Sequence, residues 1–355
     1  MCNIAGYVGD RPAAPILIEM LRRQEGLDGG YYTGIATIHN GRIHYAKLTG
    51  DLQHLLENSD AANLPGNIGI IHSRTRSGGG DEWAHPFIGK SLGRPAIAYI
   101  ANGSGGYFND LKPKFNALAD NLFSEGYEMT VEDPKYQNYN KLADGSAVHM
   151  SDLLCQDITR HIDEGISPAE AMGMGFCELP AEIVGLMLAT KTPDAITWSR
   201  LNMPVNLAFT EHGAYLSSTA TAFPADAGEP IELPPCCSGT VTKDGYTAQK
   251  FKDPPAAVPP IDAKLRADAY ALIERTLKER ECTFGDLRKV VYPAFFKDQI
   301  CPPGNLLIYS VLYALQKEGR LQSRTERLPF RDGLTAPKVH LSLKDELNSP
   351  IGERN

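Results

Sequence analysis

Short apolar runs separated by glycine-containing turns dominate the first 250 residues of the chain. Five of these runs have the length and the residue types of buried strands, and they cover residues 3–8, 67–73, 95–101, 183–190 and 205–209. Apolar residues instead recur with the period of an amphipathic helix in residues 14–23 and 151–164. Many strands combined with separate groups of helices predict an α+β fold with antiparallel sheets.

Two pairs of strand-like runs flank dipeptides that are typical of tight turns. Residues 35–38 and 43–46 lie on either side of Asn40-Gly41, which tolerates the positive φ angles of a two-residue turn. Residues 239–241 and 246–251 flank Asp244-Gly245 in the same way. We therefore expect a β-hairpin at each place.

A change of composition divides the chain after residue 250. Four prolines fall within residues 253–260, and proline continues neither a helix nor a central strand. We interpret residues 251–261 as a semi-rigid linker. It separates an N-terminal domain of residues 1–250 from a C-terminal domain of residues 262–346.

The pattern of the C-terminal segment is that of three helices followed by two strands, which resembles a winged helix. Thr283 is expected to cap the second helix. The expected helices cover residues 264–280, 283–289 and 305–317, and the expected strands cover residues 321–327 and 338–343.

The third of these helices is apolar almost all round, whereas a helix that reads DNA needs an exposed polar face. Arg324, Arg327 and Arg331 in the hairpin could meet phosphates, but the net charge of the whole chain is −8. We therefore favour a packing or partner-docking module over nucleic-acid binding.

Composition excludes several further classes of protein. No apolar run reaches the length of a membrane span, and the first ten residues lack the features of a signal peptide. The seven cysteines are scattered without metal-ligand spacing, and Cys236 and Cys237 are adjacent, which is poor geometry for a disulfide. We expect a cytoplasmic protein with free thiols, no cofactor and no metal.

Cys2 carries the most informative chemistry. Removal of Met1 would leave Cys2 with a free α-amino group, whose ordinary pKa of about 7.7–8.0 suits a general base near neutral pH. One residue would then supply both a thiol nucleophile and its base. Position 2 alone favours a plain buried cysteine instead.

Four motifs that follow one another in the sequence favour the nucleophile over the plain buried cysteine. Residues 2–6 (C-N-I-A-G) resemble the C-G-I-x-G opening of class II glutamine amidotransferases, and residues 69–79 (G-I-I-H-S-R-T-R-S-G-G) are similar to the family's G-x-x-H-T-R-x-x-T-x-G. Residues 84–87 (A-H-P-F) and 96–103 (A-I-A-Y-I-A-N-G) resemble its A-H-P and H-N-G segments. The resemblance covers roughly residues 2–225 and implies a four-layer αββα sandwich of the N-terminal-nucleophile (Ntn) hydrolase type.

The resemblance also implies roles for particular residues. Cys2 would be the nucleophile, and the side-chain amide of Asn102 with the backbone N–H of Gly103 would stabilise the tetrahedral oxyanion. Arg74 would hold the α-carboxylate of glutamine, because a guanidinium binds a carboxylate through two hydrogen bonds. Without the other motifs, Asn102-Gly103 would be interpreted as an ordinary turn.

Three further residues are expected at the substrate site. Thr75 and Ser77 belong to the same motif as Arg74. Asp144 is the best match to the family's aspartate for the substrate ammonium, although a helix-capping role for Asp144 or Ser146 fits the sequence equally well.

Two histidines at family positions, His72 and His85, are expected to be hydrogen-bonded structural residues without a metal.

The chain departs from the family pattern at several positions. The family has R-G-x-D-S-x-G-I-A where this chain has Asp28-Gly-Gly-Tyr31-Tyr32-Thr-Gly-Ile-Ala. Thr75 replaces a frequent tryptophan and Ala101 replaces a histidine. These changes bear on substrate affinity and partner communication more than on bond breaking.

The predicted function is hydrolysis of the glutamine side-chain amide to glutamate and ammonia. The sequence beyond residue 250 shows no dinucleotide or phosphate-binding motif, so ammonia would be released or would pass to a separate synthase subunit. The alternative is a non-catalytic glutamine sensor with a winged-helix output domain. The oligomeric state is left open, with a homo-oligomer among the options.

Overall fold

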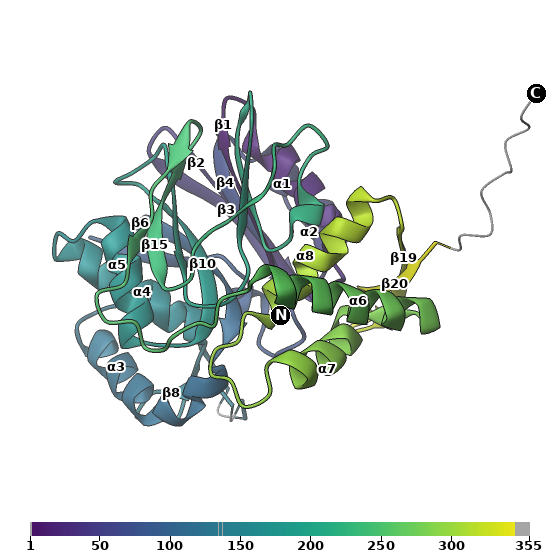
Figure 1. The fold of residues 1–355 in the computed structure, drawn as a ribbon. Coiled ribbons are helices and arrows are strands. Elements are labelled where there is room, and N and C mark those ends of the chain that lie inside the picture. The colour runs from purple at the N-terminus through teal and green to yellow at the C-terminus, as the bar shows by residue number, and fades with distance from the viewer. Residues whose placement is uncertain (1, 134, 137, 345–355) are drawn as a thin grey trace, which may run out of the picture.

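Two large antiparallel sheets and the helices that cover them form the body of the molecule (Figure 1). The computed structural model describes residues 2–133, 135–136 and 138–344. No helix among these residues has the length and apolar character needed to cross a membrane.

The first sheet is built around β1 (Asn3–Gly9), which pairs with β13 (Gly213–Ser217) on one side and with β4 (Ile68–Arg74) on the other. Its strand order is β14-β12-β13-β1-β4-β2-β3. The remaining strands are β2 (Tyr32–His39), β3 (Arg42–Thr49), β12 (Asn206–Thr210) and β14 (Ile231–Glu232).

The second sheet is built around β6 (Arg94–Ser104) and β10 (Glu182–Ala189). Its strand order is β16-β15-β11-β10-β6-β5, and β17 also pairs with β15. The remaining strands are β5 (Phe87–Ser91), β11 (Ile196–Arg200), β15 (Cys237–Thr242), β16 (Gly245–Tyr246) and β17 (Gln249–Lys250). A small separate sheet has the order β7-β9-β8 and consists of β7 (Val131–Glu132), β8 (Asn140–Lys141) and β9 (Ala147–Val148).

Alternating side chains of the strands face different layers, as the two-residue period of a strand requires. Ile4, Ile70 and Leu186 belong to a core between the two sheets. Their neighbours Ala5 and Ile71 pack instead against the helices on the outer face of the first sheet.

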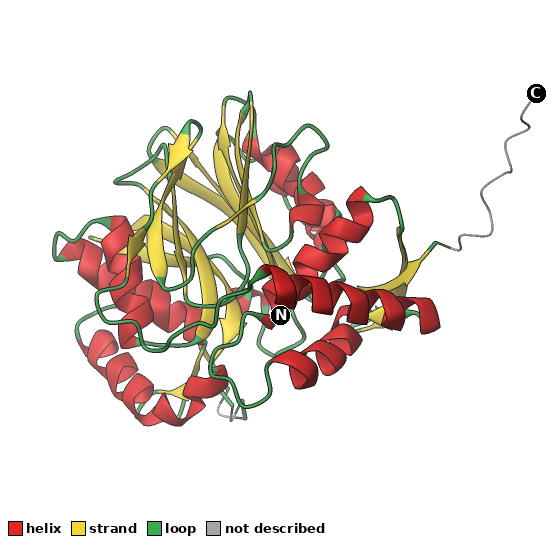
Figure 2. Cartoon of the chain, viewed as in Figure 1, coloured by secondary structure: helices red, strands yellow, loops and turns green. Residues whose placement is uncertain are grey.

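Helices cover both outer faces, so the layers run helix, sheet, sheet, helix (Figure 2). The first face carries α1 (Ala13–Arg22) and α2 (Leu52–Asn58), and the second face carries α3 (Lys112–Ser124), α4 (Met150–Asp163) and α5 (Pro168–Glu178). Short 3₁₀ turns cover Ala61–Asn63, Asp81–Trp83, Gly106–Leu111 and Ala220–Ala222.

The C-terminal segment has its own hydrophobic core and a three-stranded sheet of order β18-β20-β19. Its elements are α6 (Ala263–Glu279), β18 (Cys282–Thr283), α7 (Phe284–Phe295), α8 (Gly304–Lys317), β19 (Leu321–Pro329) and β20 (Thr335–Leu343). The winged-helix assignment of this segment stays a prediction. The last two residues of the predicted 262–346 domain lie outside the described residues, and the domain boundaries stay predictions.

Several local expectations are confirmed and others need correction. Asn40 and Gly41 have φ angles of 50° and 70° in the β2–β3 turn, as predicted. In the second hairpin Thr242 pairs with Gly245, so the turn residues are Lys243 and Asp244, not Asp244-Gly245.

Other corrections concern the C-terminal helices and the linker. Thr283 caps α7 in a capping box with Asp286, but the helix continues past Lys289 to Phe295. The predicted linker packs closely on the domain before it, because Phe251, Ala256 and Val258 contact the core under the second sheet.

Candidate active site

A hydrogen bond between Cys2 and Asn102 links the two sheets at the candidate site. Cys2 precedes β1 of the first sheet, and Asn102 lies near the end of β6 of the second sheet. The backbone N–H of Cys2 donates to Asn102 Oδ1 over 2.8 Å, and both residues are buried. Met1 lies outside the described residues, so its removal stays a prediction.

Asn102 keeps one free donor at this place. Its Nδ2 is buried and has no hydrogen-bond partner within the described part of the chain. A buried amide donor without a partner is costly, and a ligand oxygen would satisfy it. The neighbouring Gly103 is required by space, because a Cβ there would lie 2.1 Å from the carbonyl oxygen of Glu182.

A cavity of about 270 Å³ opens at Cys2. Five of the seven predicted site residues line it, namely Cys2, Arg74, Thr75, Ser77 and Gly103. Asn102 joins them through its hydrogen bond to Cys2. Further lining residues that sequence reasoning did not select include His149, Lys112, Asn109 and Tyr139.

Asp144 is the predicted site residue that does not line this cavity. It is exposed, and its Oδ1 accepts a hydrogen bond from the backbone N–H of Ser146 over 2.8 Å. The helix-capping alternative is wrong, because α4 begins at Met150 and His149 is its N-cap.

The cavity lining carries positive but no negative side chains among the residues described. Arg74 and Lys112 are its cations, and none of its lining residues is Asp or Glu. Such a lining favours the carboxylate of a ligand over its ammonium group.

Arg74 is partly engaged by its own loop. Its Nε donates to Ser77 Oγ over 2.9 Å, and its two terminal nitrogens donate to the carbonyl oxygens of Trp83 and Gly78. The guanidinium also lies 4.1 Å from the centre of the Tyr32 ring. A carboxylate bound at Arg74 therefore has to share the guanidinium with the loop that follows β4.

Burial raises the pKa of the Cys2 thiol. The nearby Arg74 guanidinium acts in the opposite direction, whereas the Asp28 carboxylate adds to the increase. Because burial disfavours the thiolate, a base has to take the thiol proton when the sulfur attacks.

Three buried histidines lie next to one another, His85 and His149 on the cavity wall and His72 against His85, and they are neutral near pH 7. Burial lowers the pKa of His72 to about 3 and the pKa values of His85 and His149 well below their ordinary range. His72 Nε2 lies 3.0 Å from the carbonyl oxygen of Ala101, which confirms its expected hydrogen bond. The same expectation is wrong for His85, whose two ring nitrogens have no partner among the described residues.

Tyr31 and Tyr32, two positions where the sequence departs from the family pattern, lie against the C-terminal hairpin. The Phe330 ring is 5.0 Å from Tyr31 and 5.8 Å from Tyr32, and the Arg331 guanidinium is 5.2 Å from the centre of the Tyr32 ring. Tyr32 therefore connects the C-terminal hairpin to Arg74. Only the fold could reveal this contact, since about 300 residues of sequence separate its partners.

The chain is similar in sequence to several glutamine–fructose-6-phosphate aminotransferases. It is 27% identical over 226 residues to the glutamine–fructose-6-phosphate aminotransferase (isomerizing) of Bartonella henselae, which is 62% of this chain and 32% of the relative. The enzyme of the same name from Pyrococcus horikoshii is 27% identical over 255 residues, 70% of this chain and 37% of the relative. The chain is a relative of the class II glutamine amidotransferases.

The names of these relatives describe enzymes that use glutamine. The aminotransferase of Caldanaerobacter subterraneus is 37% identical over 136 residues, 37% of this chain and 20% of the relative. The chain thus spans less than two fifths of the length of each of these relatives. No protein-family model matches the chain.

Two solved structures have a fold similar to that of the chain. The glutamine phosphoribosylpyrophosphate amidotransferase of B. subtilis, complexed with ADP and GMP, matches 71% of this chain and 49% of its own length. The TM-score is 0.55 at 17% identity. A structure described as the allosteric regulatory enzyme of purine biosynthesis matches with a TM-score of 0.56 at 16% identity, over the same share of each chain.

Proposed function

We propose that the chain hydrolyses the side-chain amide of glutamine with Cys2 as an N-terminal nucleophile. The Cys2 α-amino group accepts the thiol proton as the sulfur attacks the amide carbon, and it then donates that proton to the leaving nitrogen, so that ammonia leaves and a thioester remains. Water then attacks the thioester, which releases glutamate and restores the thiol. The observation that supports this most is the pairing of Cys2 N with Asn102 Oδ1 at 2.8 Å.

This pairing gives the proposed base a defined position. After loss of Met1, the backbone nitrogen of Cys2 becomes an α-amino group that sits on the same residue as the thiol. Asn102 Oδ1 accepts one of its hydrogens, which orients the nitrogen lone pair relative to the sulfur. The free amine has an ordinary pKa of about 7.7–8.0, close to the pH at which a general base is most effective.

The oxyanion would be stabilised by Asn102 Nδ2 and the backbone N–H of Gly103. The first is a buried donor without a partner in the described structure, and the second lies on the cavity wall. Donors that are already in position need no reorganisation when negative charge develops on the substrate oxygen.

We assign the α-carboxylate of glutamine to Arg74, with Thr75 and Ser77 beside it. The ammonium group of glutamine lacks an acidic partner on the described cavity wall, and Asp144 lies elsewhere. A charge-assisted hydrogen bond contributes about 1.5–3 kcal/mol, so we expect glutamine to bind weakly.

Ammonia would be released or would pass to a separate synthase subunit. The winged-helix-like segment follows the predicted glutaminase domain. We propose that this segment packs against the rest of the chain or docks a partner protein. It does not place a recognition helix in a DNA groove, because α8 is buried along most of its length.

A second candidate is a glutamine sensor without turnover. The raised pKa of the Cys2 thiol and the engagement of Arg74 by its own loop favour it. The two proposals differ in whether ammonia and glutamate accumulate.

The deciding experiment measures both products from glutamine with the purified wild type and two variants. We expect stoichiometric glutamate and ammonia from the wild type, no products from Cys2→Ala, and unchanged rates from Cys177→Ala, a half-buried cysteine outside the cavity lining. Glutamine binding without products would favour the sensor, and products from Cys2→Ala would refute the assigned nucleophile.

A further inference from the structure

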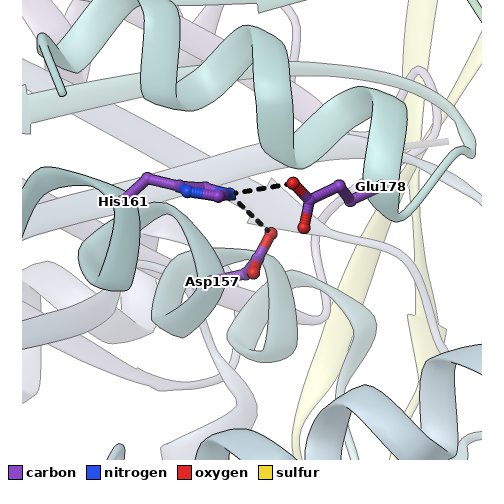
Figure 3. A group of neighbouring side chains, drawn as sticks. All are labelled: Asp157, His161 and Glu178. Carbon is purple, nitrogen blue, oxygen red and sulfur yellow. Dashed lines mark ion pairs between the residues drawn. The ribbon is translucent and has the colours of Figure 1, made fainter. Parts of the chain in front are cut away.

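A second group of chemically active side chains lies in the outer helices of the second sheet (Figure 3). Asp157 and His161 are one turn apart on α4, and Glu178 is the last residue of α5. One ligand atom from each residue lies within 4.8 Å of the other two. We propose that Asp157 Oδ2, His161 Nε2 and Glu178 Oε1 bind a divalent transition-metal ion of the zinc class.

This group is separate from the proposed active site. The cavity at Cys2 is lined by Met150 and Ser151 at the start of α4, whereas His161 lies near its end. Ten residues of α-helix span about 15 Å along the helix axis. Metal binding at this group therefore does not depend on glutamine hydrolysis at Cys2.

The state of Asp157 is the observation that points to a ligand. Its side chain is fully buried, and Oδ2 has no hydrogen-bond partner among the described residues. This oxygen points toward His161 Nε2 at 3.8 Å, and Glu178 Oε1 lies 3.2 Å from the same nitrogen (Figure 3). A buried carboxylate oxygen without a hydrogen bond is costly, and a cation between these three atoms would reduce that cost.

Neighbouring side chains hold the three residues in a suitable orientation. His161 Nδ1 lies 3.4 Å from Glu164 Oε2, and a proton on Nδ1 leaves the lone pair of Nε2 free for a metal. Carboxylates that orient a metal-bound histidine in this way are a general feature of metal sites.

Arg160 both supports this group and competes with the ion. Its Nη2 donates to Asp157 Oδ1 over 2.7 Å and to Glu178 Oε2 over 3.2 Å, which are the oxygens not used by the proposed site. The same nitrogen lies 3.3 Å from His161 Nε2, so it has to move toward Glu164 when an ion enters. Arg160 already pairs with Glu164 through Nη1 at 3.2 Å.

Imidazole nitrogen and carboxylate oxygen are both ligand types that zinc accepts, and three protein ligands leave a fourth position open. We expected no metal from the sequence, and no local spacing marks this group because Glu178 lies on a different helix from the other two residues. The ion would join the ends of α4 and α5, so its role would be to stabilise this helical layer.

The test is zinc titration of chelator-treated protein by calorimetry, together with its thermal melting. We expect one zinc ion per chain and a rise in Tm of roughly 5 °C when zinc is held at one hundred times its Kd. Magnesium at the same concentration should produce no comparable shift, because it avoids imidazole ligands. Cobalt should give visible absorption without a thiolate band, which separates this site from the cysteines.

Matched histidine variants decide the location of the ion. We expect His161→Gln and Asp157→Asn each to lose the bound zinc and the Tm shift. His212→Gln, which removes another histidine that pairs with two acids, should keep both. Absence of zinc binding at about 1 mM, or equal binding by wild type and both site variants, would overturn the proposal.

Discussion

At the scale of single residues, Asn102 connects the two halves of the proposed chemistry. Its Oδ1 accepts a hydrogen bond from Cys2, and its Nδ2 is buried without a partner in the described structure. One amide group thus orients the proposed base and offers a donor to the oxyanion. Its position near the end of a central strand of the second sheet fixes both atoms.

Asn102→Ala should therefore lower kcat for glutamine hydrolysis by about 10²–10³-fold, the usual effect of losing one oxyanion donor. KM should change little, since the amide is expected to act on the transition state more than on bound glutamine. Asn109→Ala, on the same cavity wall, is the control and should keep near-normal kcat. Steady-state kinetics of both variants check this, and a loss confined to KM would contradict the assigned role.

The sequence was sufficient to select most residues of the candidate site but not their environment. Cys2, Arg74 and Gly103 stand in motifs whose residue types follow from the chemistry, and the structure brings them to one cavity. His149 was not selected, because a lone histidine before a helix carries no signal until the fold places it on the cavity wall. Asp144 was selected on a weak local match, and in the fold it bonds to Ser146 away from the cavity.

At the scale of elements, α4 joins the cavity to the helical layer behind the second sheet. Its first turn holds Asp152, which is buried and accepts hydrogen bonds from Thr130 N and Gln156 Nε2. Burial raises the pKa of Asp152 to about 6. The protonated form is thus favoured in the folded chain, compared with an ordinary pKa of about 3.9 in the unfolded chain.

Asp152 should make the folded state less stable as pH rises. For an acid with a raised folded-state pKa, the stabilisation is complete below about pH 4 and is lost by about pH 6, with a magnitude of about 2–3 kcal/mol. Asp152→Asn should remove this contribution. Denaturant unfolding of both proteins from pH 4 to pH 7 measures the difference, and parallel stability curves would contradict the prediction.

The elements that sequence patterns missed are those whose stability depends on packing. α5 contains Gly173 and Gly175, which are poor helix formers. A Cβ on Gly175 would lie 3.0 Å from Ile158 of α4, so the glycine permits close contact between the two helices. The β2–β3 hairpin, in contrast, was predictable because Asn40-Gly41 specifies its own turn.

At the scale of the whole molecule, the C-terminal hairpin is attached to the predicted glutaminase domain beside the candidate active site. Arg327 pairs with Asp51, a buried carboxylate that also caps α2, and Arg331 Nη2 donates to Thr49 Oγ1 over 2.9 Å. Phe330 contacts both tyrosines that replace family residues. Tyr31, Tyr32 and the C-terminal hairpin thus form one contact surface.

Arg327→Ala should destabilise the chain by about 1–3 kcal/mol, because it removes a charged partner from a buried carboxylate that still caps its helix. Arg324→Ala is the matched control on the same strand. It breaks an ion pair with Glu281 in which the arginine is 56% exposed, so its effect should stay below about 1 kcal/mol. Equal effects in denaturant unfolding would argue against docking through Asp51.

The most direct test of the central claim is mass analysis of the purified chain after reaction with a glutamine-mimicking diazoketone. We predict that Met1 is absent, that one adduct forms per chain, and that peptide mapping assigns it to the sulfur of Cys2. Retention of Met1 in protein that still hydrolyses glutamine, or an adduct that persists in Cys2→Ala, would contradict the account.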